Sequence, residues 1–197
     1  LGFDGAHAFG CTYKGRRVGS FGRAEVFSFH ATKFMNSFEG GAIVTDDDQL
    51  AEKLRLMENF GFSGLDQVTY IGTNGKMTEA CAAMGLTSLE SIDHFLEANR
   101  RNFNIYQKEL SGLPGIRVMD FPANDASNYQ YIILRINPEV TGITRDAICE
   151  ALHRENVIAR RYFYPGVHRM EPYRSYQPHA HLMLPQTERI VQEVLAL

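Results

Sequence analysis

EVFSFHATKFMNSFEGGAIVT, residues 25–45, contains two short apolar runs on either side of a polar segment. Val26–Phe29 and Ala42–Val44 have the length and composition of buried strands, and a glycine pair, Gly40–Gly41, precedes the second run. The polar segment between them carries one lysine, Lys33. The end of a strand gives a reactive group rigid support, and a loop gives it access. The stretch therefore predicts two strands that flank a loop presenting Lys33.

Two interpretations of Lys33 follow from the residues alone. Apolar surroundings disfavour the charged form of an amine, which makes the amine a nucleophile for aldehydes and a candidate for a Schiff base. Ser28, near the end of the first run, adds a hydroxyl that can donate to a phosphate. A solvated loop lysine beside an ordinary serine accounts for the same spacing. On spacing alone the simpler interpretation is favoured.

Four strings in order are more specific than this single lysine. They are FDGAHAFG at residues 3–10, SFHATK followed by EGGAIVT within 28–45, GTNGKMTE at 72–79 and RYFYPGVH at 161–168. Together they resemble the DegT/StrS-type sugar aminotransferases over essentially the whole chain. The resemblance implies an α/β protein and the C-terminal part of a type I pyridoxal-phosphate transferase fold, that of aspartate aminotransferase. Residues 1–92 would be the remainder of the large cofactor-binding domain, and residues 93–197 a small α+β domain, incomplete at its end.

The resemblance also assigns roles to residues around the cofactor, pyridoxal 5′-phosphate. Lys33 would hold it as a Schiff base and then act as general base and acid. Asp4 would pair with the pyridinium nitrogen, His7 would lie near the ring's phenolic oxygen, and Ser28 would bind the phosphate. Asp4 before Gly5 is also a common turn pairing, which is the simpler explanation without the family.

Asn74 would cross a dimer interface and touch the partner's cofactor phosphate, as the resemblance implies. The family more often has N-Y-R-M where this chain has Asn74-Gly75-Lys76-Met77. Lysine is a point charge rather than a fork, so the exchange argues against a bidentate clamp. The Asn-Gly pair also predicts a type I′ turn.

Residues 160–181 are rich in Arg, Tyr and His and are the candidate substrate segment. Tyr164 and His168 are candidate sugar contacts, together with His30 from the lysine loop. Arg160, Arg161 and Arg169 could meet the diphosphate of a nucleotide sugar.

Composition narrows the function classes further. The net charge of −3 gives no electrostatic argument for nucleic acid or an anionic membrane, and no apolar run approaches the length of a membrane span. Three widely spaced cysteines suit neither a disulfide framework nor a zinc site and fit a reducing cytoplasm. His179 and His181 alternate in a loop without a third ligand nearby, so no metal site is predicted.

Periodicity and turn signals predict the remaining elements. Residues 10–24 should form a loop or small hairpin, and Leu1–Phe3 the tail of a strand. Further strands are expected at Ile116–Met119, Tyr129–Ile136 and Val157–Arg160, and helices at 46–61, at 77–110 with a break near Gly85 or Ser91–Asp93, at Thr144–His153, and at Gln186–Leu197. Leucine at position 1 and an uncapped last helix predict an internal fragment, and the resemblance implies that an N-terminal half is missing.

The resulting hypothesis is a cytoplasmic, homodimeric aminotransferase with shared active sites. It would move an amino group from an amino acid, glutamate by family analogy, to a keto group of a nucleotide-linked deoxy sugar. Polysaccharide or antibiotic-sugar biosynthesis is the setting that the family suggests. Two alternatives stay open: an inactive fragment of such an enzyme, and an aminotransferase of the same fold that acts on a cyclitol or another keto substrate.

Overall fold

The computed structural model describes all residues 1–197 and divides into two compact units. Unit 1 comprises residues 1–100 and 121–130, and unit 2 comprises residues 101–120 and 131–197. The chain therefore returns to unit 1 for one short segment, residues 121–130, between two stretches of unit 2. None of the helices is both long and apolar enough to cross a membrane.

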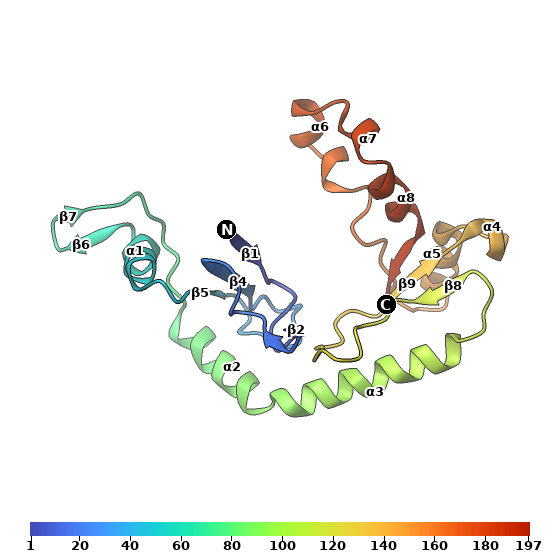
Figure 1. Ribbon diagram of the computed structural model, residues 1–197, viewed down its shortest axis with the longest axis horizontal. Coiled ribbons are helices and arrows are strands. Elements are labelled where there is room, and N and C mark those ends of the chain that lie inside the picture. The colour runs from blue at the N-terminus through green and yellow to red at the C-terminus, as the bar shows by residue number, and fades with distance from the viewer. The chain divides into compact units, whose positions relative to one another are not determined.

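A three-stranded sheet, in the order β1-β4-β5, forms the centre of unit 1 (Figure 1). Strand β1 pairs parallel with β4, in a register that places Asp4 opposite Val26. Strands β4 and β5 are antiparallel, and Ser28 lies opposite Gly41. The elements of this unit are β1 (Gly2–Asp4), β2 (Thr12–Tyr13), β3 (Arg16–Arg17), β4 (Ala24–Ser28), β5 (Gly41–Val44), α1 (Asp48–Glu58), β6 (Phe62–Gly64), β7 (Gln67–Val68), α2 (Glu79–Glu90) and the first part of α3 (Ile92–Leu110).

The two faces of this sheet differ in burial. Phe27 of β4 is buried, and the ring of Phe9 makes edge-to-face contacts with Phe27 and Phe29. Val26 and Ile43, which are cross-strand partners, project from β4 and β5 and are 44% and 49% exposed. Side chains alternate between the faces of a sheet, so one face is packed by aromatic rings and the other presents an apolar surface.

Glu25 is a buried carboxylate inside unit 1, with 1% of its surface exposed. Its oxygens accept hydrogen bonds from the backbone N–H groups of Gly19, at 2.7 Å, and Phe21. Buried charges need such partners to offset the loss of hydration. Glu25 thereby holds the turn that precedes β4.

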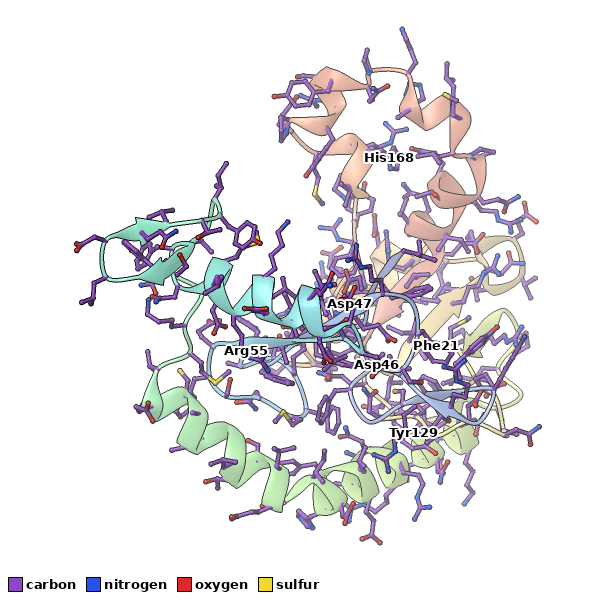
Figure 2. The ribbon with its side chains drawn as sticks, turned by 60° about the vertical axis from the view of Figure 1, so that its left-hand side comes forward. Phe21, Asp46, Asp47, Arg55, Tyr129 and His168 are labelled. Carbon is purple, nitrogen blue, oxygen red and sulfur yellow. The ribbon has the colours of Figure 1, made fainter.

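Helix caps follow the side-chain chemistry of the sequence. At the start of α1, Asp47 accepts from the backbone N–H of Leu50. Asp47 and its neighbour Asp46 are labelled in Figure 2. Thr78 caps α2 by accepting from the N–H of Cys81. Short polar side chains satisfy N–H groups that have no partner within the helix. The expected long helix at 77–110 is interrupted at Ser91, the C-cap of α2, which confirms a break in the predicted region.

Unit 2 is built on an antiparallel sheet in the order β10-β9-β8. Its core contains Leu134 and Ile136 of β9, Leu195 of β10 and Val191 of α8, all of them buried. The elements are the second part of α3, β8 (Ile116–Val118), β9 (Ile133–Ile136), α4 (Pro138–Thr141), α5 (Arg145–Arg154), a 3₁₀ turn (Val167–Arg169), α6 (Tyr173–Tyr176), α7 (Ala180–Met183), α8 (Pro185–Glu193) and β10 (Val194–Ala196).

Three of the predicted elements differ in this unit. The strand expected at Tyr129–Ile136 begins only at Ile133, and Tyr129 has a positive φ of 55°, which lies outside the extended region. The helix expected at Gln186–Leu197 ends at Glu193, since the apolar Val194–Ala196 pairs with β9 and buries Leu195. The strand expected at Val157–Arg160 is reduced to one bridge, between Arg160 and Ala196.

The Asn74–Gly75 turn is also corrected. A type I′ turn needs positive φ at both central residues, and neither Asn74 nor Gly75 has one. Asn74 instead forms an isolated antiparallel bridge with Asn59, and the N–H of Gly75 donates to the Glu58 carbonyl at 2.8 Å. The segment is held against the end of α1 rather than folded on itself.

Arg145 joins three parts of unit 2 although only 1% of it is exposed. Its guanidinium donates to the carbonyls of Val194, at 2.5 Å, and Val191, at 2.8 Å, and to the Asp146 carboxylate at 2.7 Å. The last carbonyls of a helix have no partner within it, and a cation there also interacts favourably with the helix dipole. Arg145 thus caps the C-terminus of α8 from α5.

Replacing Arg145 by methionine is expected to lower the free energy of unfolding by about 3 kcal/mol, because carbonyls of α8 and β10 lose their donor. Urea denaturation followed by circular dichroism measures the loss. Arg154→Met is the matched control: Arg154 lies on the same helix, is exposed, and pairs only with Glu150 at the surface, so its loss should stay within about 0.5 kcal/mol. Equal losses would contradict the capping role.

Candidate active site

The candidate site of unit 1 lies where β1 and β4 end. Parallel strands place their carboxyl ends at one edge of a sheet, and side chains at that edge face a ligand crevice in α/β proteins. Asp4 is the last residue of β1 and Ser28 the last of β4. The N–H of Gly5 donates to the carbonyl of Val26 at 2.8 Å, which continues the pairing past Asp4. The loops that follow both strands therefore start side by side.

Lys33 and His7 come from these two loops and are in contact. The Nζ atom of Lys33 lies 3.0 Å from Nε2 of His7. The two residues help to line one small cavity, whose full lining is Ala6, His7, Phe9, Ser28, Lys33, Phe34, Met35, Asn128 and Gln130. The predicted residues Lys33, His7 and Ser28 are thus brought together, and Asp4 precedes them on β1.

Burial and the contact with Lys33 both affect the pKa of His7. The pKa of His7 lies below its usual value, first because partial burial disfavours the imidazolium, and second because the Lys33 ammonium repels a second positive charge. The Asp4 carboxylate acts in the opposite direction and is the weakest of the three causes. A neutral imidazole can accept a hydrogen bond from the Lys33 ammonium through Nε2.

Asp4 itself is exposed, and one of its carboxylate oxygens accepts from the backbone N–H of Ala6 at 2.9 Å. This bond fixes the carboxylate at the strand end and leaves its other oxygen for a ligand. The hydroxyl oxygen of Ser28 accepts a long hydrogen bond, of 3.4 Å, from the backbone N–H of His30. Both groups are oriented by the backbone of the site loops.

His30, a predicted substrate residue, is exposed on the lysine loop. Its Nδ1 is 2.9 Å from the hydroxyl of Thr32, and its Nε2 is 3.5 Å from the carboxylate of Glu39. Asn74 is outside the set that lines the Lys33 cavity. The contacts of Asn74 are those of the bridge to Asn59 described above.

Asn128 and Gln130 are site residues that the sequence analysis missed. Asn128 is 2% exposed and donates through Nδ2 to the carbonyls of His7 and Phe9, at 2.8 and 3.1 Å. Gln130 donates to the Thr32 carbonyl at 2.6 Å and accepts from the Phe34 N–H at 3.0 Å. The sequence predicts a loop that ends at Asn128 and a strand that begins at Tyr129, so neither Asn128 nor Gln130 carries a separate signal of a site role.

Unit 2 contains the other two predicted substrate residues. The ring centroid of Tyr164 lies 5.1 Å from the guanidinium carbon of Arg145 and 4.9 Å from that of Arg161. These distances are within the range of cation–π attraction. His168 lies among the short helices of this unit (Figure 2), and its Nε2 is 2.5 Å from the Glu188 carboxylate.

Glu188 holds two basic residues at once. Arg169 donates to both of its oxygens, at 2.7 and 2.6 Å, in a bidentate pair, and His168 shares the first oxygen. The Arg169 guanidinium and then the His168 ring lower the pKa of Glu188 from 4.5 to about 2. Arg169 is consequently held in a close ion pair, whereas the ion pair of Arg161 with Asp146 is long, at 3.8 Å.

The chain belongs to the DegT/DnrJ/EryC1/StrS aminotransferase family, whose model matches residues 1–197. It is 36% identical over 171 residues to a dTDP-4-amino-4,6-dideoxy-D-glucose transaminase of Shigella dysenteriae, covering 87% of this chain and 46% of that protein. The Escherichia coli transaminase of the same name is 33% identical and covers 99% of this chain and 53% of that protein. The chain thus spans about half the length of the curated relatives that it matches.

Solved structures give the same assignment. The structure of DesI in the presence of its TDP-sugar product superposes with a TM-score of 0.92 at 52% identity, over 100% of this chain and 50% of that one. Helicobacter pylori PseC, an aminotransferase involved in the biosynthesis of pseudoaminic acid, superposes at 0.89 and 26% identity, over 100% of this chain and 53% of that one. These findings confirm the predicted family and fold class.

The family implies pyridoxal phosphate, and the residues at the sheet edge fit this cofactor. An amine for the aldehyde, a carboxylate for the pyridinium nitrogen and a hydroxyl for the phosphate are the groups that it requires. Lys33, Asp4 and Ser28 supply them from adjacent loops and strand ends.

Removing the Lys33 ammonium is expected to raise the pKa of His7. Burial, the larger cause of the low pKa, remains in Lys33→Met, so the increase should be partial. The titration of the His7 ring in the cofactor-free protein, followed by NMR, measures it. Lys53→Met, on the exposed face of α1, should leave the His7 titration unchanged. An unchanged midpoint in Lys33→Met would show that the two side chains are not in contact.

Glu188 is expected to make stability depend on pH at the acid end. Because its folded pKa is below its unfolded value of 4.5, its stabilisation is complete above that pH and is lost as pH falls towards 2. Urea midpoints measured across this range should fall less steeply in Glu188→Gln than in the wild type. Glu150→Gln, at an exposed surface pair, is the control and should follow the wild-type curve. A Glu188→Gln curve parallel to the wild type would refute the assignment.

Proposed function

We propose that residues 1–197 carry the lysine-bearing part of the active site of a pyridoxal-phosphate-dependent aminotransferase. The complete protein would move an amino group from an amino acid, with glutamate as the expected donor, to a keto group of a nucleotide-linked deoxy sugar. The observation that carries the proposal is the 3.0 Å contact between Lys33 Nζ and His7 Nε2, at a sheet edge that also bears Asp4 and Ser28. Family membership and the similarity to two deoxy-sugar transaminases support the substrate class.

When bound, pyridoxal phosphate supplies the electron sink for the reaction. Lys33 is the residue that would hold its aldehyde covalently, and Lys33 Nζ would also serve as the general base and acid that holds and moves a proton. His7, kept neutral by burial and by the Lys33 charge, accepts a hydrogen bond at Nε2 and orients the amine. Neutral His7 therefore supports Lys33 without competing for a proton.

Asp4 and Ser28 would bind opposite ends of the cofactor. A carboxylate favours the protonated pyridinium, and the Asp4 oxygens are held in place by the Ala6 N–H. The Ser28 hydroxyl can donate to the phosphate, since its contact to the His30 N–H uses it only as an acceptor. Asn74 is assigned to the phosphate of the partner's cofactor, in a cytoplasmic homodimer with shared active sites.

Substrate contacts are assigned within each unit by itself, to His30 in unit 1 and to Tyr164 and His168 in unit 2. Tyr164 presents a ring that is already flanked by two guanidinium groups, and Arg161 has one long ion-pair contact, so this pair suits a diphosphate-linked sugar. His168 is oriented by Glu188 through Nε2. His30 extends from the lysine loop on the exposed side.

Borohydride reduction after incubation with pyridoxal phosphate is expected to label Lys33. The complete gene product that contains residues 1–197 is digested after reduction, and the modified peptide is identified by mass spectrometry. Lys33→Arg should lose the label, because a guanidinium does not form the Schiff base, and Lys53→Arg should keep it. A folded wild-type protein that carries no label at Lys33 would contradict the proposal.

A further inference from the structure

We infer that Asn128 and Gln130 are positioning residues for the lysine: their side-chain amides hold the His7 loop and the Lys33 loop in register with each other. The inference rests on the proposed function of Lys33 and extends it to residues that do not contact the reacting atoms. Both residues lie in the segment 121–130, which returns from unit 2 to unit 1. They also line the cavity that contains Lys33 and His7.

Gln130 binds the backbone on both sides of Lys33. Its Nε2 donates to the carbonyl of Thr32 at 2.6 Å, and its Oε1 accepts from the N–H of Phe34 at 3.0 Å. A primary amide has a donor and an acceptor, as a peptide group does. The Gln130 side chain therefore bonds to the backbone of this loop as a neighbouring strand would. Two bonds to the residues that flank position 33 fix its Cα and limit the directions available to its side chain.

Asn128 performs the equivalent task for the other loop. Its Nδ2 donates to the carbonyls of His7 and Phe9, and its Oδ1 accepts from the backbone N–H of Gln130 at 3.1 Å. Carbonyl oxygens only accept, so the atom facing them is the amide nitrogen. The carbonyl of Asn128 in turn accepts from Asn99 of α3 at 3.0 Å. The Asn128 side chain is buried, and both its nitrogen and its oxygen are hydrogen-bonded.

The two amides are joined to each other and thereby join the two loops. The path runs from the His7 carbonyl through the Asn128 side chain to the Gln130 backbone, and from the Gln130 side chain to the peptides around Lys33. The contact between Lys33 Nζ and His7 Nε2 spans the same two loops at the level of the side chains. The hydrogen bonds of the two amides thus join the backbones of the two loops, and the spacing of the backbones sets the distance between Lys33 and His7.

Uncharged amides bonded to main-chain groups cannot transfer protons at neutral pH, so a catalytic role is not assigned to either residue. Their contribution is geometric. A displacement of about 1 Å at a reacting group can cost about a hundredfold in rate. Loss of the Gln130 bonds is expected to act through the position of Lys33 alone.

Gln130→Met is the principal test, because methionine has a similar length and lacks both hydrogen-bonding groups. Gln130→Glu is the second variant: it keeps an acceptor for the Phe34 N–H and loses the donor to the Thr32 carbonyl. Asn124→Leu is the matched control, since Asn124 is an exposed amide in the same segment and is not among the residues that line the cavity. Circular dichroism and urea denaturation establish that each variant is folded.

The first readout needs no cofactor. In the wild type, Lys33→Met should raise the pKa of His7, as argued above. In the Gln130→Met background the same Lys33→Met change should raise it much less, because the two side chains are no longer held together. This double-mutant cycle isolates their coupling. A purely structural role for Gln130, as a stabiliser of the segment 121–130, would leave the coupling intact.

The second readout is the rate at which pyridoxal phosphate becomes attached to Lys33, followed by borohydride trapping in the complete gene product. Gln130→Met is expected to slow attachment by about tenfold or more, with a smaller effect in Gln130→Glu and no effect in Asn124→Leu. If Gln130→Met does not fold, Gln130→Glu is judged by the same two readouts. Wild-type coupling and wild-type attachment rates in the folded Gln130 variants would overturn the inference.

The two proposals fail in different ways. If wild-type Lys33 is never labelled, the proposed function is wrong, and the coupling measured in cofactor-free protein still decides whether Gln130 positions Lys33. If the wild type is labelled and the Gln130 variants behave like it, the proposed function stands and the positioning role is wrong.

Discussion

Parallel pairing of β1 with β4 is the constraint on which the candidate site depends. Two parallel strands end at the same edge, so the loops that carry His7 and Lys33 begin from neighbouring positions. The bond from the Gly5 N–H to the Val26 carbonyl extends the pairing beyond the last residue of β1. The ring of Phe9, in the loop after β1, makes edge-to-face contacts with the rings of Phe27 and Phe29. Every other feature of the site builds on this arrangement.

Much of this arrangement could be predicted from the sequence. The apolar runs around Lys33 correspond to β4 and β5. The four family strings identified the fold class, because a glycine pair, a lysine and a strand end in fixed order form a pattern that is visible locally. The Thr144 cap of α5 and the break at Ser91 also follow local rules of helix ends. The roles of the site residues and the domain boundary at 92/93 stay predictions.

The parts that could not be predicted depend on contacts between residues distant in sequence. Val194–Ala196 continues a helical pattern but pairs with β9, because burying Leu195 in a sheet gains more than one further helical turn. The amide of Asn128 binds carbonyls about 120 residues earlier in the chain. Neither partner is visible in a local window, and an asparagine at the end of a predicted loop looks like an ordinary polar position.

The link between the two site loops consists of neutral primary amides rather than ion pairs. Amides do not titrate in the range where lysine and histidine exchange protons. Lys33 and His7 can therefore gain or lose charge while the scaffold around them stays bonded in the same way. An ion pair in that position, such as the one between Arg169 and Glu188, would have tied the geometry of the site to the protonation state of its carboxylate. In unit 1 the protonation of Lys33 and His7 can therefore change without changing the hydrogen bonds that hold their loops in place.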